Sequence, residues 1–210
     1  MNILAIGAHF DDLEIGCGGT LARYVAAGHT VHAYVATQSG WKNPSQEVVR
    51  SDDIALAEGI EASRILGIRL HRGSFRTFEV EFSDALTSEL LRILEPNAID
   101  LAFMPWDGDV HHDHHAVALA GLHVCRHVPR ILMYRANWYR SAKEFVGAYY
   151  VDISAHWETK EKAILAHASE IQRTGAAWIE YFKNQAANAG REVGVKYAEV
   201  FQVVKYLERT

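Results

Sequence analysis

Short apolar segments alternate along the chain with longer segments whose apolar residues recur at helical spacing. This alternation is typical of βαβ units and predicts an α/β fold with a mainly parallel sheet flanked by helices. Strands are expected at residues 2–7, 31–35, 68–70, 99–103, 131–134, 148–151 and 201–204. Helices are expected at residues 18–27, 46–66 and 84–94, and from the histidine-rich segment 111–115 to about residue 126.

Turn-forming residues and the last third of the chain refine this pattern. Gly28 and Gly67 follow two expected helices and are suited to cap them. Residues 39–44 are expected to form a loop that covers the edge of a site. In the last third, large apolar residues recur every seven positions: Trp157, Ile164, Ile171 and Trp178. This stripe is short and Gly175 interrupts it, so a pair of helices packed on the core is favoured over a coiled coil.

Length and composition favour a single Rossmann-like domain over residues 1–210, with no linker or repeat. A net charge of −5 without a run of Lys or Arg argues against a nucleic-acid partner. No apolar run approaches the ~20 residues that span a bilayer, and no signal peptide precedes the first strand. A cytoplasmic protein without a membrane partner is therefore expected, and a homo-oligomer stays open. Cys17 and Cys125 are too far apart to indicate a disulfide framework or a thiolate zinc site.

Two clusters of metal-binding residue types each follow an expected strand. His9, Asp11 and Asp12 follow the first strand, and four of the chain's 12 histidines lie within residues 111–115, after strand 99–103. In an open parallel sheet, ligands bind at the carboxyl ends of the strands. Carboxylates and imidazoles gathered there carry a repulsion and desolvation cost that a cation relieves. The sequence therefore predicts one metal site divided between the two clusters.

The spacing within each cluster indicates possible roles. His9 and Asp12 are three residues apart and can reach one ion, whereas successive side chains such as those of Asp11 and Asp12 diverge. One carboxylate would then stand beside the ion as general base for a water molecule. His111 and His114 would share a helix face, so one can bind the ion while the other faces the substrate. Zn²⁺ is the expected ion, and Fe²⁺ fits the same donor types.

Other interpretations stay open at this level. Asp11 and Asp12 could be the negative groups favoured at the amino end of a helix, and residues 111–115 a solvated turn. A sugar- or nucleotide-binding module would bind ligand without forming product, and a metal-storage or sensing protein built on the His111–His115 cluster would hold several ions. Residues 16–19, Gly-Cys-Gly-Gly, lack the GxGxxG spacing and a Walker lysine, so close helix packing is favoured over phosphate binding.

Four segments resemble motifs of the LmbE/PIG-L-type zinc-dependent de-N-acylases, which remove acetyl or similar groups from amino sugars and their conjugates. The family opens with Ala-His-Pro-Asp-Asp and a Gly-Gly-Thr helix start, which reads here as Ala-His-Phe-Asp-Asp at 8–12 and Gly-Gly-Thr at 18–20. Its His-Pro-Asp-His motif appears as His-His-Asp-His at 111–114. A Glu-to-Leu-Gly helix motif is similar to residues 58–67, and Tyr-Ala-Glu-x-Phe to residues 197–201.

The resemblance implies hydrolysis of an N-acyl group, expected to be N-acetyl, on a small amino-sugar-type substrate with zinc as cofactor. It implies three metal ligands: His9, Asp12 and His114. It also implies that Asp11 is the general base and that His111 polarises the oxyanion or helps to protonate the leaving amine. Asp113 lies between two histidines and is expected to set the tautomer of one imidazole.

The chain departs from the family pattern around the expected site. Phe10 and His112 replace prolines, and His112 becomes a spare potential ligand. Relatives often place an arginine three residues before the helix Glu, where this chain has Ala55, and Arg50 is the expected substitute. A Trp can stack on a pyranose ring and an Arg can hold an anionic group. The candidate substrate contacts are Trp41, Arg50, Trp106 and Arg191.

Overall fold

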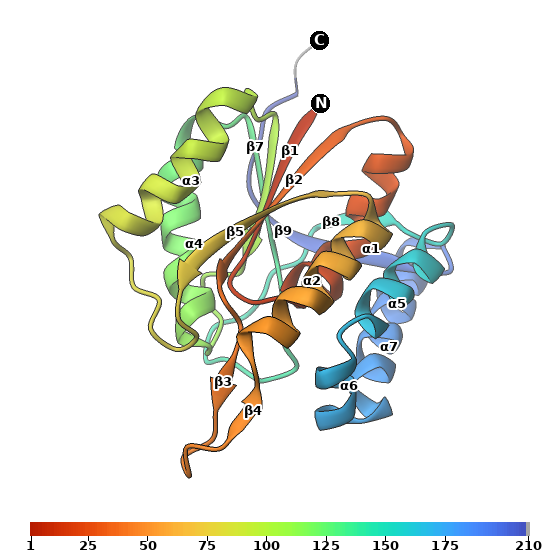
Figure 1. Ribbon diagram of the computed structural model, residues 1–210. Coiled ribbons are helices and arrows are strands. Elements are labelled where there is room, and N and C mark those ends of the chain that lie inside the picture. The colour runs from red at the N-terminus through yellow and green to blue at the C-terminus, as the bar shows by residue number, and fades with distance from the viewer. Residues whose placement is uncertain (209–210) are drawn as a thin grey trace.

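A computed structural model describes residues 1–208. Its seven-stranded sheet has the order β5-β2-β1-β6-β7-β9-β8 (Figure 1). The first five of these strands run parallel, and β9 pairs antiparallel with both β7 and β8. The strands are β1 (Asn2–Gly7), β2 (Thr30–Thr37), β5 (Arg69–Phe75), β6 (Leu101–Pro105), β7 (Arg130–Tyr134), β8 (Tyr149–Asp152) and β9 (Ala198–Tyr206). The expected α/β architecture is confirmed.

Helices cover both faces of this sheet. They are α1 (Asp12–Ala26), α2 (Asp52–Leu66), α3 (Asp84–Asn97), α4 (His112–Val124), α5 (Trp157–Leu165), α6 (Ala168–Thr174) and α7 (Ala176–Val193). α1, α2 and α5–α7 lie on one face, and α3 and α4 lie on the other (Figure 1). Accordingly, Ile3 and Ala5 of β1 join one apolar cluster, whereas Leu4 and Ile6 join the other. Within residues 1–208, no helix is long and apolar enough to cross a membrane.

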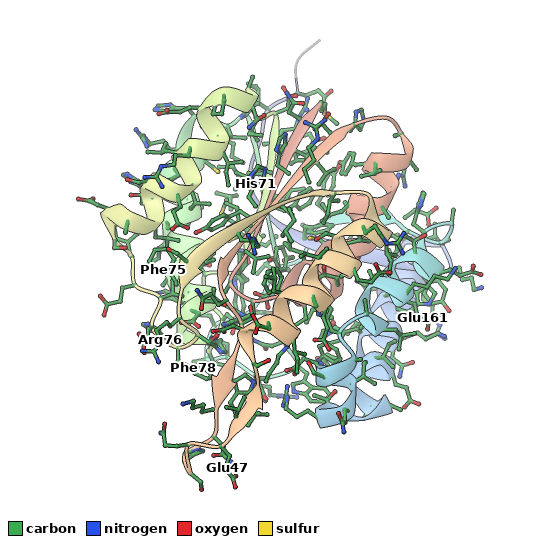
Figure 2. The ribbon with its side chains drawn as sticks, in the orientation of Figure 1. Glu47, His71, Phe75, Arg76, Phe78 and Glu161 are labelled. Atoms are coloured by element: carbon green, nitrogen blue, oxygen red, sulfur yellow. The ribbon has the colours of Figure 1, made fainter. Side chains whose placement is uncertain are left out.

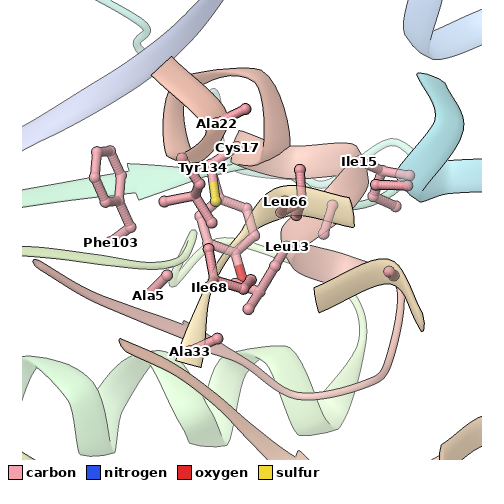
Figure 3. Packing of buried hydrophobic residues seen from close by; sticks show 14 of the residues in the cluster. Ala5, Leu13, Ile15, Cys17, Ala22, Ala33, Leu66, Ile68, Phe103 and Tyr134 are labelled. Atoms are coloured by element: carbon pink, nitrogen blue, oxygen red, sulfur yellow. The ribbon is translucent and has the colours of Figure 1, made fainter. Parts of the chain in front are cut away.

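The glycine-rich part of α1 permits close packing against the sheet. A Cβ at Gly16 would lie 2.1 Å from Cδ2 of Tyr134, and one at Gly19 would lie 2.7 Å from Cδ1 of Ile153. The Tyr134 ring therefore packs directly on the helix backbone, and its hydroxyl donates to the Ile6 carbonyl at 2.6 Å. Figure 3 shows this ring among the buried side chains between α1 and the sheet. The packing interpretation of these glycines is confirmed.

The structure corrects three expected boundaries. α1 begins at Asp12 rather than at residue 18, because packing offsets the low helix propensity of its glycines. The loop expected at 39–44 and the start of the helix expected at 46–66 instead form a hairpin of β3 (Trp41–Lys42) and β4 (Val48–Arg50). α2 begins after Ser51, whose hydroxyl accepts the Ile54 amide. The last third contains three helices where a pair was expected, because Gly175, with φ of 74°, separates α6 from α7.

A buried ion pair between α5 and β9 also contacts α1. Lys160 Nζ lies 2.5 Å from Glu199 Oε1 and donates to the Ile15 carbonyl at 2.8 Å. The same carboxylate accepts the amides of Gly19 and Thr20 at 3.0 and 2.7 Å. Glu199 is the central residue of the Tyr-Ala-Glu-x-Phe segment, so this motif holds the first helix against the sheet.

Replacing Lys160 by methionine should destabilise the protein by about 3–5 kcal/mol, because the buried Glu199 carboxylate loses its counter-ion. Urea unfolding followed by circular dichroism measures the change. Lys162→Met on the exposed side of the same helix is the matched control and should change the free energy of unfolding by less than about 0.5 kcal/mol. Equal small effects of the two substitutions would contradict this role for the pair.

Candidate metal centre and active site

The two histidine-carboxylate clusters meet at one edge of the sheet. β1 and β6 are parallel neighbours, with Ile3 opposite Leu101 and Ala5 opposite Phe103. The segments after these strands therefore leave the sheet side by side, although they are about a hundred residues apart in sequence. α1 begins in the first segment and α4 in the second. A cavity of about 290 Å³ opens between them, and its lining includes His9, Asp11, Asp12, His111 and His114.

Three donor groups lie at distances suited to one tetrahedral ion. His9 Nδ1 lies 3.2 Å from His114 Nε2, which lies 3.0 Å from Asp12 Oδ1. His9 Nδ1 approaches the Asp12 carboxylate most closely at its other oxygen, Oδ2, at 3.7 Å. Ligands at the usual zinc distances of about 2.0–2.2 Å stand roughly 3.3 Å from one another in a tetrahedron. The donor types and their spacing fit Zn²⁺.

Hydrogen bonds around these groups orient each donor atom toward the others. His9 Nε2 bonds Asp113 Oδ2 at 2.8 Å, and His114 Nδ1 bonds Asp109 Oδ2 at 3.1 Å. Each carboxylate thus holds a proton on the ring nitrogen that it contacts, the outer nitrogen. The other nitrogen of each ring, the inner one, is left with a lone pair for a metal ion. Asp12 Oδ2 accepts the amides of Ala8 and His9, both at 2.8 Å, which fixes the third donor.

The electrostatic balance of the cluster favours a positive charge at its centre. Burial alone would raise the pKa of Asp12, but His114 and His9 lower it below its usual value. Burial likewise opposes a charge on His114, yet the neighbouring Asp12 and Asp109 carboxylates raise its pKa to about 10. A proton satisfies this demand, and so does a divalent cation that displaces the proton.

His111 differs from the other two imidazoles. It is the N-cap of α4, where its Nδ1 accepts the Asp113 amide at 3.2 Å. Burial and the nearby His9 and His114 lower its pKa to about 4, so the neutral ring carries its proton on Nε2. Coordinating atoms of His9, His111 and His114 all lie within 4.8 Å of one another, so this trio is a second geometrically possible ligand set.

Phe78 packs on His111 from a strained loop. The two rings stack with centroids 5.5 Å apart at 20°, and the Phe78 amide donates to Asp113 Oδ2 at 2.7 Å. Figure 2 shows Phe78 near the base of the β3–β4 hairpin. Its ring meets the Trp41 ring edge-on, with the centroids 6.3 Å apart. Phe78 has φ of 68°, a left-handed conformation that is uncommon for bulky residues. Asp113 therefore supports both His9 and the wall of the cavity.

Asp11 also has a strained backbone and an unusual electrostatic environment. Its φ is 132°, and its side chain does not cap α1 although it occupies the N-cap position. Burial raises the pKa of its carboxyl well above the usual value, with Asp12 adding to the effect and Arg50 opposing it. Ser39, with φ of 63°, lies on the same cavity, so strained positions gather around it as they do at functional sites.

The structure brings only some of the candidate substrate contacts to this cavity. Trp41 and Arg50 line it. The Arg50 guanidinium is 2.7 Å from Glu58 and donates to the Phe10 carbonyl at 3.1 Å, so it is committed within the protein. Trp106 and Arg191 lie elsewhere, which corrects that expectation: Trp106 is buried edge-on against Phe145, and Arg191 is exposed on α7 and bonded to Asn188. His112, the spare potential ligand, is exposed on α4.

Sequence reasoning missed two supporting residues of the centre. Asp109 holds His114, and Asn137 donates its side-chain amide to both oxygens of Asp109 at 2.5 Å. Asp109 had a local signal, because it is an acidic residue in the turn just before the second cluster. Asn137 had none, since it follows β7 and reaches the site only through the pairing of β6 with β7.

Comparisons with known proteins place this arrangement in a family. Residues 4–125, more than half of the chain, match the model of PIG-L, GlcNAc-PI de-N-acetylase. The chain belongs to the PIG-L family. It is 33% identical to the uncharacterized deacetylase YaiS of Escherichia coli over 140 residues, 63% of this chain and 72% of that protein. It is 27% identical to the diacetylchitobiose deacetylase of Thermococcus kodakarensis over 96% of this chain and 82% of that protein.

A solved structure agrees with this membership of the PIG-L family. The conserved protein TT1542 of Thermus thermophilus has a TM-score of 0.78 and 28% sequence identity, covering 99% of this chain and 96% of that one. The family model ends at residue 125, close to the end of α4. It therefore includes both histidine-carboxylate clusters, whereas the cavity wall built by later residues lies outside it.

Replacing Asp113 by asparagine should weaken metal binding about 10- to 100-fold, because His9 loses the carboxylate that holds its proton and orients its ring. Both carboxylate oxygens of Asp113 accept backbone amides, from Phe78 and Val80, so the NH₂ group of an asparagine would face one of these N–H donors. Competition with a chelator of known affinity measures the change. Asp107→Asn, two residues before Asp109, is the control. Its carboxylate faces Lys143 at 3.8 Å, and only its backbone carbonyl, which the change keeps, bonds a histidine, His115, outside the ligand set. A similar loss there would contradict the assignment.

Proposed function

We propose that this chain is a metal-dependent N-deacetylase that removes an acetyl group from an amino sugar or an amino-sugar conjugate. The proposal is carried by the convergence of His9, Asp12 and His114 within 3.0–3.7 Å, beside the separate carboxylate of Asp11 in one cavity. Membership of a family with deacetylase relatives supports the reaction. The relative named diacetylchitobiose deacetylase supports an acetylated sugar as substrate.

His9, Asp12 and His114 are the ligand set that we propose, rather than the three histidines. His9 and His114 each have a carboxylate that keeps the proton on the outer nitrogen. The Nδ1 of His111 already accepts the Asp113 amide, so the proton of its neutral ring occupies Nε2, the atom that would have to bind the metal. Two nitrogens and one oxygen suit Zn²⁺, and Fe²⁺ accepts the same donors.

The residues around the cavity can then perform amide hydrolysis. A Zn²⁺ ion held there would supply Lewis acidity toward a water molecule and the amide carbonyl. Asp11 takes a proton from the attacking water as its oxygen bonds the acyl carbon. His111 donates a hydrogen bond from Nε2 to the carbonyl oxygen as negative charge develops, an effect worth about 3 kcal/mol. Asp11 then returns its proton to the nitrogen as the C–N bond breaks, which yields acetate and an amine.

The walls of the cavity suit a sugar ring. Trp41, Trp138 and Trp178 all contribute to its lining. Flat aromatic faces offer apolar contact to the C–H faces of a pyranose, while carboxylates and hydroxyls nearby can bond its hydroxyl groups. These features favour an N-acetylated amino sugar over an N-acetylated peptide.

Acetate release from a panel of substrates tests the proposal. Zinc-loaded protein should release acetate from N,N'-diacetylchitobiose or another N-acetylhexosamine conjugate, and chelator-treated protein should not. Metal analysis should find about one ion per chain. Sugar binding without acetate release would favour a non-catalytic module, and several ions per chain would favour a metal-storage protein; either result would contradict the proposal.

A further inference from the structure

The C-terminal helices supply a second wall of the cavity that the proposed reaction does not use. Glu170, Arg173 and Thr174 of α6 and Trp178 of α7 line the same cavity as the histidines. All four follow residue 125, where the match to the family model ends. The reaction groups therefore come from the part of the chain that the family model covers, and this wall comes from residues after it.

Glu170 is a buried carboxylate with one oxygen left for a ligand. Its side chain is 94% buried, although the residue lines the cavity. Oε2 accepts Nε of Arg173 at 2.8 Å and also bonds the Nη2 group of that arginine. Within residues 1–208, Oε1 accepts no hydrogen bond. Oε1 is not one of the buried side-chain atoms that lack a partner, so it is open to the solvent of the cavity that Glu170 lines, where a ligand hydroxyl could replace water as its donor.

The pair is held in place across the mouth of the cavity. The Arg173 guanidinium lies over the Trp41 ring, 5.8 Å from its centroid. This contact joins α6 to the β3–β4 hairpin, which projects from the same end of the sheet (Figure 1). Arg173 is thereby fixed between an aromatic ring and a carboxylate, and Glu170 cannot turn freely toward solvent. A fixed acceptor beside an aromatic face is the arrangement expected for a sugar subsite.

We propose that Glu170, oriented by Arg173, is a specificity-determining residue that accepts a hydrogen bond from a ring hydroxyl of the amino sugar. The inference rests on the proposed function, because it assumes that an amino sugar enters this cavity. Arg173 is already paired with Glu170 and Arg50 with Glu58, so the two cations that line the cavity are matched within the protein. Neither arginine is left to pair with an anionic ester group on the sugar. The wall therefore selects a sugar with a free hydroxyl group at the position that contacts Glu170.

Binding of the deacetylated sugar tests this inference without relying on catalysis. Zinc-loaded wild-type and Glu170→Gln proteins are titrated calorimetrically with methyl β-glucosaminide and with its 3-, 4- and 6-deoxy analogues. Glu170→Gln should bind the full sugar about 10- to 100-fold more weakly, since a charged hydrogen-bond acceptor is lost. With the wild-type protein, one deoxy analogue should bind more weakly than the full sugar by a similar factor. With Glu170→Gln, that analogue and the full sugar should bind equally well.

The matched control is Glu180→Gln, the same change on an exposed position of α7, which should leave all four affinities unchanged. A structural role for Glu170 would weaken every analogue equally and would overturn the inference, as would the absence of any measurable sugar binding. Hydrolysis is scored separately. If the sugar binds with the expected pattern but no N-acetyl form releases acetate, the proposed function fails and the specificity role stands.

Discussion

Replacing His114 by alanine should abolish both metal binding and acetate release. His114 Nε2 is the donor closest to both of the others, at 3.2 Å from His9 Nδ1 and 3.0 Å from Asp12 Oδ1. Losing an outer-shell partner typically costs 10- to 100-fold in metal affinity, so losing a ligand should cost more than about 100-fold. Metal analysis after dialysis should therefore find less than about 0.1 ion per chain, if wild type holds one.

His112→Ala is the matched control for this substitution. His112 lies on the same helix, two residues away, and is exposed. It should leave metal content and rate unchanged. Because His114 is buried against Asp109, its removal could also impair folding. His9→Ala serves as a second test, since the His9 ring is more exposed and its loss should give the same metal-free protein. Full metal retention in either ligand variant would refute the ligand assignment.

The location of the site could be predicted from sequence because two simple rules combine there. Ligands bind at the carboxyl ends of parallel strands, and each cluster directly follows an apolar strand. The structure adds the fact that β1 and β6 are neighbours. That pairing joins segments about a hundred residues apart. The sequence of either cluster alone could therefore not show which of its atoms contact the other cluster. Asn137 was missed for the same reason, because it reaches the site through the pairing of β6 with β7.

Predictions failed where they depended on loops and on tertiary contacts. Trp106 was expected at the substrate because it follows a strand, but its ring turns into the apolar cluster beneath α4. The sequence pattern predicts a loop and a helix start where the structure has the β3–β4 hairpin, because short strands carry little periodicity. Glu170 had no signal, because a single acidic residue in an amphipathic helix is ordinarily on a solvated face.

Two of the departures from the expected family motifs, at residues 10 and 55, meet at α2. Phe10, which replaces a proline, is buried against α2, where a Cβ at Gly59 would lie 2.1 Å from its ring. Ala55, in the usual position of an arginine, is also buried on this helix. Arg50 enters instead from β4 and reaches Glu58 at 2.7 Å. The phenyl ring thus fits because the neighbouring helix offers small residues, and the arginine reaches the family glutamate from another element.

Replacing Asp11 by asparagine should reduce kcat by about 10²- to 10⁴-fold while metal content stays at the wild-type level, because general-base catalysis is worth that much. Asparagine keeps the size and shape of the side chain at this strained position, where φ is 132°, so the turn before α1 should be preserved. Asp12→Asn, one position later, should instead lose the metal, because Asp12 contacts both proposed imidazole ligands. Acetate release under saturating substrate and metal analysis separate the two outcomes. A near-normal rate for Asp11→Asn would show that another group takes the proton, whereas loss of metal from this variant would make Asp11 a ligand rather than a base.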